Sequence, residues 1–264
     1  MKITFFFAVF FLLDLFACFC AYLQYPLPDI EDAKFIEDCV RAHNTFRSKV
    51  KPAASNMFRM SWDSALAKTA KAWAKKCKFK HNPNLEKPGK MHPTFQVVGE
   101  NIWTGTATIF SVDTALSSWF NEVSSYDFST NRCTDMCGHY TQVVWAESYK
   151  VGCAVHFCNT VEYFSQVSRA AHFVCNYGPA GNYPRKPYQA GQPCSGCSNE
   201  KCVDKLCGKT KPPVPSYVPP AEHPLSSCDQ YCLTVLILRP LFLVLSASAV
   251  LLVQQRFPHT FFYE

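Results

Sequence analysis

The chain has 264 residues, with 26 Lys or Arg against 20 Asp or Glu, which gives a formal net charge of +6. The basic residues are scattered, apart from one helical face around Lys68–Lys80, and this modest charge argues against a nucleic-acid-binding protein. Fifteen cysteines exceed what an ordinary cytosolic protein carries and indicate a disulfide framework formed in an oxidising compartment.

Residues 1–20 predict a secretory signal peptide, because Lys2 is followed by an apolar run that is too short to span a bilayer. Cys18 and Cys20 place small side chains at the two positions that signal peptidase reads, which predicts cleavage before Ala21. An uncleaved signal anchor is the alternative, and Asp14 inside the run argues against it. We therefore expect the chain to enter the secretory pathway.

Three amphipathic helices are predicted within residues 32–187, a stretch with the size of one domain. Apolar residues recur at helical spacing over residues 35–46, over residues 62–77 with Asp63 near the start, and over residues 112–120 after Ser111. The aromatic rings of Trp103, Trp119 and Trp145 are expected to pack in the core rather than to form a ligand-binding box.

Two strands follow these helices. Apolar residues alternate over residues 151–157 and again over residues 172–177. Helices that precede strands indicate an α+β domain with an antiparallel sheet.

Two short segments separate this domain from the C-terminal region. Residues 188–208 hold four cysteines and are too small and polar to pack without disulfides. Residues 209–231 form a Pro-rich linker, whose prolines favour an extended and semi-rigid spacer.

A transmembrane helix is predicted over residues 232–253, an apolar run long enough to cross about 30 Å of hydrocarbon at about 1.5 Å per residue. Arg239 lies off-centre, where its side chain can reach the interface. A glycolipid-anchor signal attached at Ser226 or Ser227 is the alternative, but such signals end on their apolar run. Here residues 254–264 follow, with Arg256 on the expected cytoplasmic side. We expect a single-pass membrane protein with an extracellular N-terminal domain.

Three motifs mix polar and aromatic residues in an unusual order: GENIW at 99–103, GHYTQVVWA at 138–146 and HFVCNYGPAGNY at 172–183. They resemble the signatures of the CAP superfamily, which comprises cysteine-rich secretory proteins, antigen 5 and plant pathogenesis-related proteins. The resemblance covers residues 32–187, and residues 188–208 resemble the cysteine-rich hinge that follows the domain in that family. It implies a three-layer α-β-α sandwich with a large cleft.

The resemblance also implies which residues line the cleft: His81, Glu100, Glu122 and His139. In the family reading His81 and His139 bind a divalent metal and the two glutamates lie beside them. Imidazole and carboxylate groups together suit Zn²⁺, but two protein ligands make an open site that holds the metal weakly. Other polar residues of the motifs either hydrogen-bond to these four or hold the motif loops together: Asn101, Tyr140 and Gln142.

The disulfide pattern is implied by the resemblance as well. The expected pairs are Cys77–Cys158, Cys153–Cys175, Cys133–Cys137, Cys194–Cys202 and Cys197–Cys207. Cys39 is then left over as a buried thiol on its helix.

Three functions are compatible with these features. The first is a non-enzymatic extracellular module that binds a protein, lipid or metal ligand. The second is a hydrolase in which His and Glu act as base and orienting group, although the chain has neither a G-x-S-x-G nor an H-E-x-x-H motif. The third is lipid or sterol binding, which the family resemblance also allows. We expect the first, with an unidentified protein or lipid partner.

Overall fold

The computed structural model describes residues 27–208 and residues 248, 252, 255 and 256. The predicted signal peptide and Pro-rich linker lie outside the described residues, and so do the predicted span and tail except at those four positions. Among the described residues, no helix has both the length and the apolar character needed to cross a membrane.

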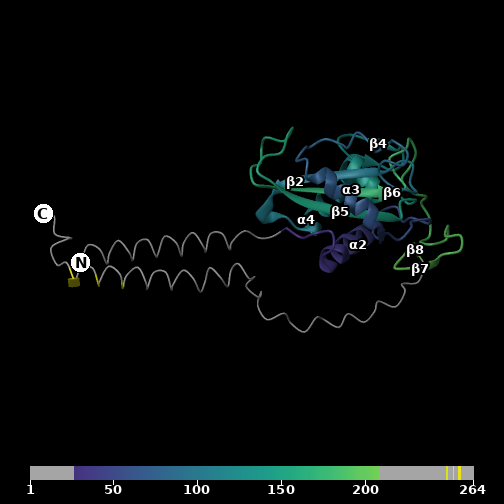
Figure 1. The fold of residues 1–264 in the computed structure, drawn as a ribbon. Helices are drawn as coiled ribbons and strands as arrows, with labels where there is room; N and C mark the ends of the chain where they lie inside the picture. Colours follow the sequence, from purple (N-terminus) through teal and green to yellow (C-terminus); the bar gives the residue numbers. More distant parts are fainter. Residues whose placement is uncertain (1–26, 209–247, 249–251, 253–254, 257–264) are drawn as a thin grey trace. The chain divides into compact units, whose positions relative to one another are not determined.

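Along residues 27–208 the helices precede the two longest strands, and a short hairpin follows those strands (Figure 1). The main elements are α2 (Ala33–Arg47), β1 (Ser61–Trp62), α3 (Ser64–Ala74), β2 (Gly99–Thr106), α4 (Val112–Asn121), α5 (Gly138–Val143), β5 (Lys150–Cys158) and β6 (Ala170–Gly178). Short 3₁₀ turns and hairpins connect or follow them: η1 (Ala107–Ile109), η2 (Glu122–Ser125), β3 (Tyr126–Asp127) with β4 (Arg132–Cys133), and β7 (Lys201–Val203) with β8 (Leu206–Gly208).

The central sheet has the strand order β1-β5-β6-β2. The long strands β5, β6 and β2 pair in antiparallel fashion, as the sequence predicts. The short edge strand β1, which was not predicted, pairs with β5 in parallel, so the sheet as a whole is mixed. Parallel neighbours need a long crossover connection, and most of the domain lies between β1 and β5 in the chain.

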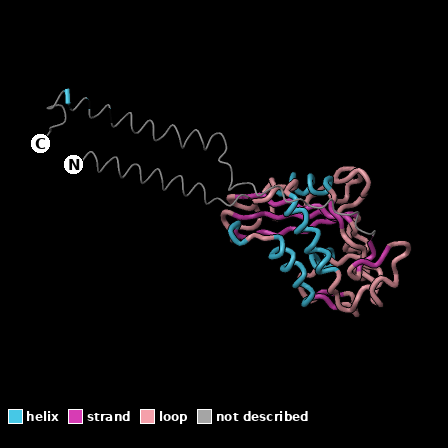
Figure 2. Tube along the Cα trace, turned by 90° about the horizontal axis from the view of Figure 1, so that it is seen from below, coloured by secondary structure: helices cyan, strands magenta, loops and turns pink. Residues whose placement is uncertain are grey.

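Helices cover both faces of this sheet, which confirms the three-layer arrangement (Figures 1 and 2). On one face α3 packs Ala67 and Ala70 against Ala154 and Val174. On the other face α2 and α4 pack against the alternate side chains of β5 and β6. The approach of α3 is so close that a Cβ atom at Gly152 would overlap the backbone of the helix.

Local sequence signals explain where the helices begin. The Asp63 side chain accepts hydrogen bonds from the backbone of α3, and Ser111 caps α4 in the same way. The helix predicted over residues 62–77 is shorter than expected, because Trp62 belongs to β1 and Cys77 lies beyond the last turn with φ of +51°. The apolar spacing at these two positions is satisfied by packing outside the helix.

Trp119 and Trp145 are buried in the core, as expected. Trp103 is partly buried and packs against the core. Within residues 27–208 the structure has five disulfides, and they join the same cysteines that the family resemblance pairs. Cys39 is a buried free thiol among the described residues.

The cysteine-rich hinge is part of the folded body. In the β7–β8 hairpin Leu206 and Cys207 are buried. The Cys207 backbone donates to Met57 O and accepts from Arg59 N, both at 2.8 Å. The hairpin is therefore fixed to the loop between α2 and β1 by main-chain hydrogen bonds.

A candidate metal-binding cavity

The first histidine–carboxylate pair joins the segment after α3 to the start of β2. His81 Nδ1 lies 3.0 Å from Glu100 Oε1, and the same oxygen accepts a 3.0 Å hydrogen bond from the Asn82 backbone. The Glu100 side chain is completely buried, whereas that of His81 is 62% exposed. The hydrogen bond to Glu100 raises the pKa of His81 above its usual value, against an opposing effect of burial.

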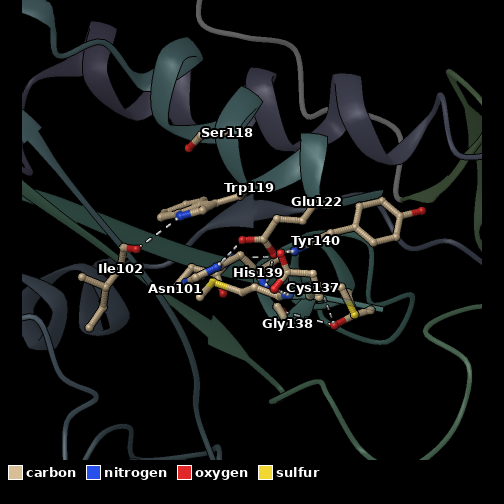
Figure 3. Close-up of polar contacts among 12 residues, drawn as sticks. Asn101, Ile102, Ser118, Trp119, Glu122, Cys137, Gly138, His139 and Tyr140 are labelled. Atoms are coloured by element: carbon tan, nitrogen blue, oxygen red, sulfur yellow. Dashed lines mark hydrogen bonds and ion pairs between the residues drawn. The ribbon is translucent and has the colours of Figure 1, made fainter. Parts of the chain in front are cut away.

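The second pair joins the end of α4 to the first turn of α5. His139 Nδ1 lies 2.6 Å from Glu122 Oε1. The other oxygen of Glu122 accepts hydrogen bonds from the backbone N–H groups of His139 and Tyr140. These N–H groups belong to the helix start and have no partner within the helix, so the carboxylate both caps α5 and orients its imidazole (Figure 3).

Neighbouring groups fix the position of His139. The Trp119 ring is stacked on the imidazole with 6.0 Å between ring centroids, and its Nε1 donates to Ile102 O (Figure 3). Asn101 Nδ2 donates to the backbone oxygen of His139 at 3.0 Å. The ring is therefore held by contacts from α4 and η2, and its backbone by a contact from β2.

Both imidazoles line one cavity of about 350 Å³. The wall includes His81, Glu100 and His139 together with Lys80, Met136 and Asn182. The structure thus brings three of the four expected residues to one cavity surface, and places Glu122 behind His139 through its hydrogen bond.

The arrangement fits a metal ion that prefers imidazole nitrogen. Each Nδ1 is engaged by a carboxylate, which leaves Nε2 as the free ring nitrogen. A carboxylate behind the ring is the usual way in which proteins orient a metal-binding histidine. Glu100 Oε2 is buried without a hydrogen-bond partner among the described residues, and a ligand in the cavity is one way to satisfy it. Among the described residues, no group of three or more His, Cys, Asp or Glu side chains is placed so that it could hold a metal ion.

The three motif residues whose role the sequence leaves open have three different roles. Asn101 holds His139 directly, as described above. Gln142 instead ties loops together, accepting from Gly181 N and donating to Ser148 Oγ. Tyr140 is buried in an aromatic cluster with Phe120.

Asn182 also lines the cavity and was not predicted from the sequence. Its Nδ2 donates to Gly138 O and its Oδ1 accepts from the Thr141 hydroxyl, so these two hydrogen bonds stabilise the first turn of α5. The position lies inside the third motif, and the motif was the signal that could have drawn attention to it.

Comparison with known proteins agrees with this architecture. Glioma pathogenesis-related protein 1 of Mus musculus is 46% identical over 237 residues, which cover 88% of this chain and 89% of that protein. GLIPR1-like protein 1 of Bos taurus is 48% identical over 216 residues, covering 80% and 88%. The crystal structure of NaASP2 with Zn²⁺ matches with a TM-score of 0.53 at 29% identity, covering 70% of this chain and 98% of that one.

The sequence pattern of one family matches residues 40–177, a range that includes the first two motifs, the first half of the third and both histidine–carboxylate pairs. The chain belongs to that family, CAP, the cysteine-rich secretory protein family.

Proposed function

We propose that this protein is an extracellular, membrane-tethered binding module whose cavity holds a divalent cation such as Zn²⁺ between His81 and His139. The observation that carries the proposal is the pair of imidazoles on one cavity wall, each with Nδ1 bound to a carboxylate. A CAP-family relative whose structure is titled as containing Zn²⁺ supports the choice of metal. The bound cation would supply a Lewis-acidic centre with positions open to a ligand's oxygen or nitrogen atoms.

A binding role fits the surroundings of the two rings better than hydrolysis does. Among the described residues no serine, threonine or cysteine side chain hydrogen-bonds to His81 or His139. Ser118, which lies near Trp119 in Figure 3, donates its hydroxyl to Ala115 O within its own helix. Nucleophilic catalysis needs a hydroxyl or thiol within reach of the base, so the geometry favours ligand binding.

Zinc titration of the purified full-length chain by calorimetry tests this proposal. His81→Ala and His139→Ala should each abolish binding, because one imidazole without a thiolate holds Zn²⁺ poorly. Glu122→Gln should weaken binding about 10–100-fold, the usual effect of changing a residue that orients a ligand. His156→Ala is the matched control, since this residue lies on β5 and does not line the cavity. Equal affinity in all four variants and the wild type would refute the metal site.

The pH dependence of zinc binding sharpens the test. A proton competes with the metal for Nε2, so affinity falls as the pH falls through the pKa of each ring. Because Glu100 raises the pKa of His81, the loss should begin above about pH 6.5, the usual value for histidine. In Glu100→Gln the onset should move to lower pH. If the pH at which zinc affinity begins to fall is the same in Glu100→Gln and the wild type, His81 is not a ligand of the metal.

The tether is tested separately by topology. If residues 232–253 span a membrane, a tag at the C-terminus will be protected from protease added outside intact cells, while residues 27–208 remain accessible. Release of the protein by a phospholipase specific for glycolipid anchors would contradict the spanning helix.

A further inference from the structure

The outer side of α3 concentrates lysines that the cavity does not use. The helix buries Leu66, Ala67, Ala70 and Ala74, and its contacts are with β5 and β6. The opposite side faces solvent and carries Lys68, Lys71, Lys75 and Lys76, which we call the lysine face. At about 100° per residue Lys68, Lys71 and the C-cap residue Lys75 fall within an arc of about 60°, and Lys76 follows directly after the helix end.

Most of this charge is uncompensated. Lys71 pairs with Asp29, but Lys68, Lys75 and Lys76 form no ion pair among residues 27–208. The charges also act on the strand beneath, since the pKa of His156 is lowered first by burial and next by Lys75 and Lys71. The lysine face is thus a group of neighbouring positive charges, two of which are close enough to act on His156 of β5.

Helix stability explains only part of the pattern. Cations near a helix C-terminus are favoured by the helix dipole, which accounts for Lys71 and Lys75. Lys68 lies in the middle of the helix and Lys76 lies beyond its end, where this effect is weak. Like charges at neighbouring positions repel one another, so the cluster carries a cost that an anionic partner would remove.

We propose that the lysine face binds a sulfated polysaccharide. Lys68 and Lys75 are about 10 Å apart along the helix axis, which suits a linear polyanion rather than a single small anion. Lysine ammonium groups act as point charges and do not require the planar geometry that arginine prefers. A membrane surface fits less well, because interfacial helices insert an apolar side and the apolar side of α3 is buried in the core.

The test is binding of the full-length chain to immobilised heparin by surface plasmon resonance, with chelator present so that the cavity metal plays no part. The test variant combines Lys68→Gln, Lys75→Gln and Lys76→Gln. The matched control combines Lys49→Gln, Lys51→Gln and Lys205→Gln, which remove the same charge from exposed lysines elsewhere. Each lysine of the face should contribute about fivefold in affinity, the value typical of a lysine at an anionic surface, so the test variant should weaken binding about 100-fold.

Additional binding measurements distinguish a sulfated polysaccharide from other anionic ligands. Binding of the wild type should weaken steeply with added salt, and less steeply for the test variant. Chemically desulfated heparin and hyaluronan, which keep carboxylates but lack sulfates, should bind far more weakly than heparin. Equal losses in the test and control variants would overturn the lysine face as the site. Stronger binding to phosphatidylserine vesicles than to heparin would overturn the polysaccharide in favour of a membrane.

Discussion

The cavity and the interior between α2 and the sheet each contain a histidine, His81 and His43, whose pKa values are shifted in opposite directions. In the cavity His81 bonds to a carboxylate and its pKa is raised. In the interior His43 donates from Nδ1 to Cys39 O and its Nε2 lies 3.0 Å from the Tyr177 hydroxyl, without a carboxylate. Burial then lowers the pKa of His43 to about 4. The partner of the ring, rather than the residue type, decides whether a histidine is held charged or neutral.

The interior also contains a buried arginine, Arg47, whose hydrogen-bond partners are uncharged, like those of His43. Arg47 is 1% exposed and donates to the backbone oxygens of Phe58, Val143, Trp145, Ala146 and Ser148. Burial lowers its pKa to about 9. Backbone carbonyl groups are the only hydrogen-bond partners of this side chain among the described residues, and through them Arg47 connects α2 to the end of α5. In the cavity, by contrast, each carboxylate is bonded to an imidazole that has a free Nε2.

The largest expected effect comes from removing that guanidinium. Arg47→Met leaves at least two buried carbonyl groups without a donor, at about 1–3 kcal/mol each, so we expect a loss of about 4 kcal/mol in the free energy of unfolding. The control is Arg41→Met on the same helix, where exposed ion pairs with Asp38 and Asp113 are worth less than about 1 kcal/mol. Urea denaturation with intact disulfides measures both, and equal losses would contradict the structural role of Arg47.

A second test uses acid. His43 and His172 both have pKa values of about 4 in the folded protein, each lowered first by burial. The unfolded chain, with ordinary histidines near 6.5, therefore binds more protons as the pH falls, and stability decreases. Between pH 7 and pH 5 each histidine should cost about 2 kcal/mol of unfolding free energy. His172→Asn should remove about half of this pH dependence, and an unchanged dependence would show that His172 is not held neutral.

The smallest effect concerns the raised pKa in the cavity. Its sign is opposite, because the His81–Glu100 bond stabilises the fold at pH values below the ordinary histidine pKa and is lost as the pH rises through the folded value. Glu100→Gln should lower the pKa of His81 in an NMR titration with chelator present, while Glu122→Gln should leave it unchanged. A pKa of His81 that is the same in all three proteins would contradict the pairing.

Much of the fold follows from patterns that are local in the sequence. The apolar spacing of residues 35–46 and the capping side chains Asp63 and Ser111 define their helices without reference to the rest of the chain. The parallel strand β1 could not be predicted, because two residues carry no periodic signal and only their neighbour β5 makes them a strand. The short helix α5 is similar, since the Glu122 carboxylate that caps it comes from another element.

For the site, the family resemblance identified the four residues but not their geometry. That Glu100 is buried beneath an exposed His81 depends on the pairing of β2 with β6, which is a long-range contact. The contribution of Asn182 could not be predicted either. Asn182 itself adopts a left-handed backbone conformation, with φ of +61°, and its side chain bonds to Gly138 of α5, which is distant in the sequence. Such contacts are set by tertiary packing rather than by local propensity.

The docked hinge has a mechanical consequence. Two disulfides, Cys194–Cys202 and Cys197–Cys207, cross-link the segment that ends in the β7–β8 hairpin, and Cys207 is also bonded to the main chain of the domain. A pulling force applied beyond residue 208 would first load these covalent bonds and the short hairpin. The load would therefore be borne at this corner of the domain, and the histidine–carboxylate pairs could keep their geometry while the protein is under tension.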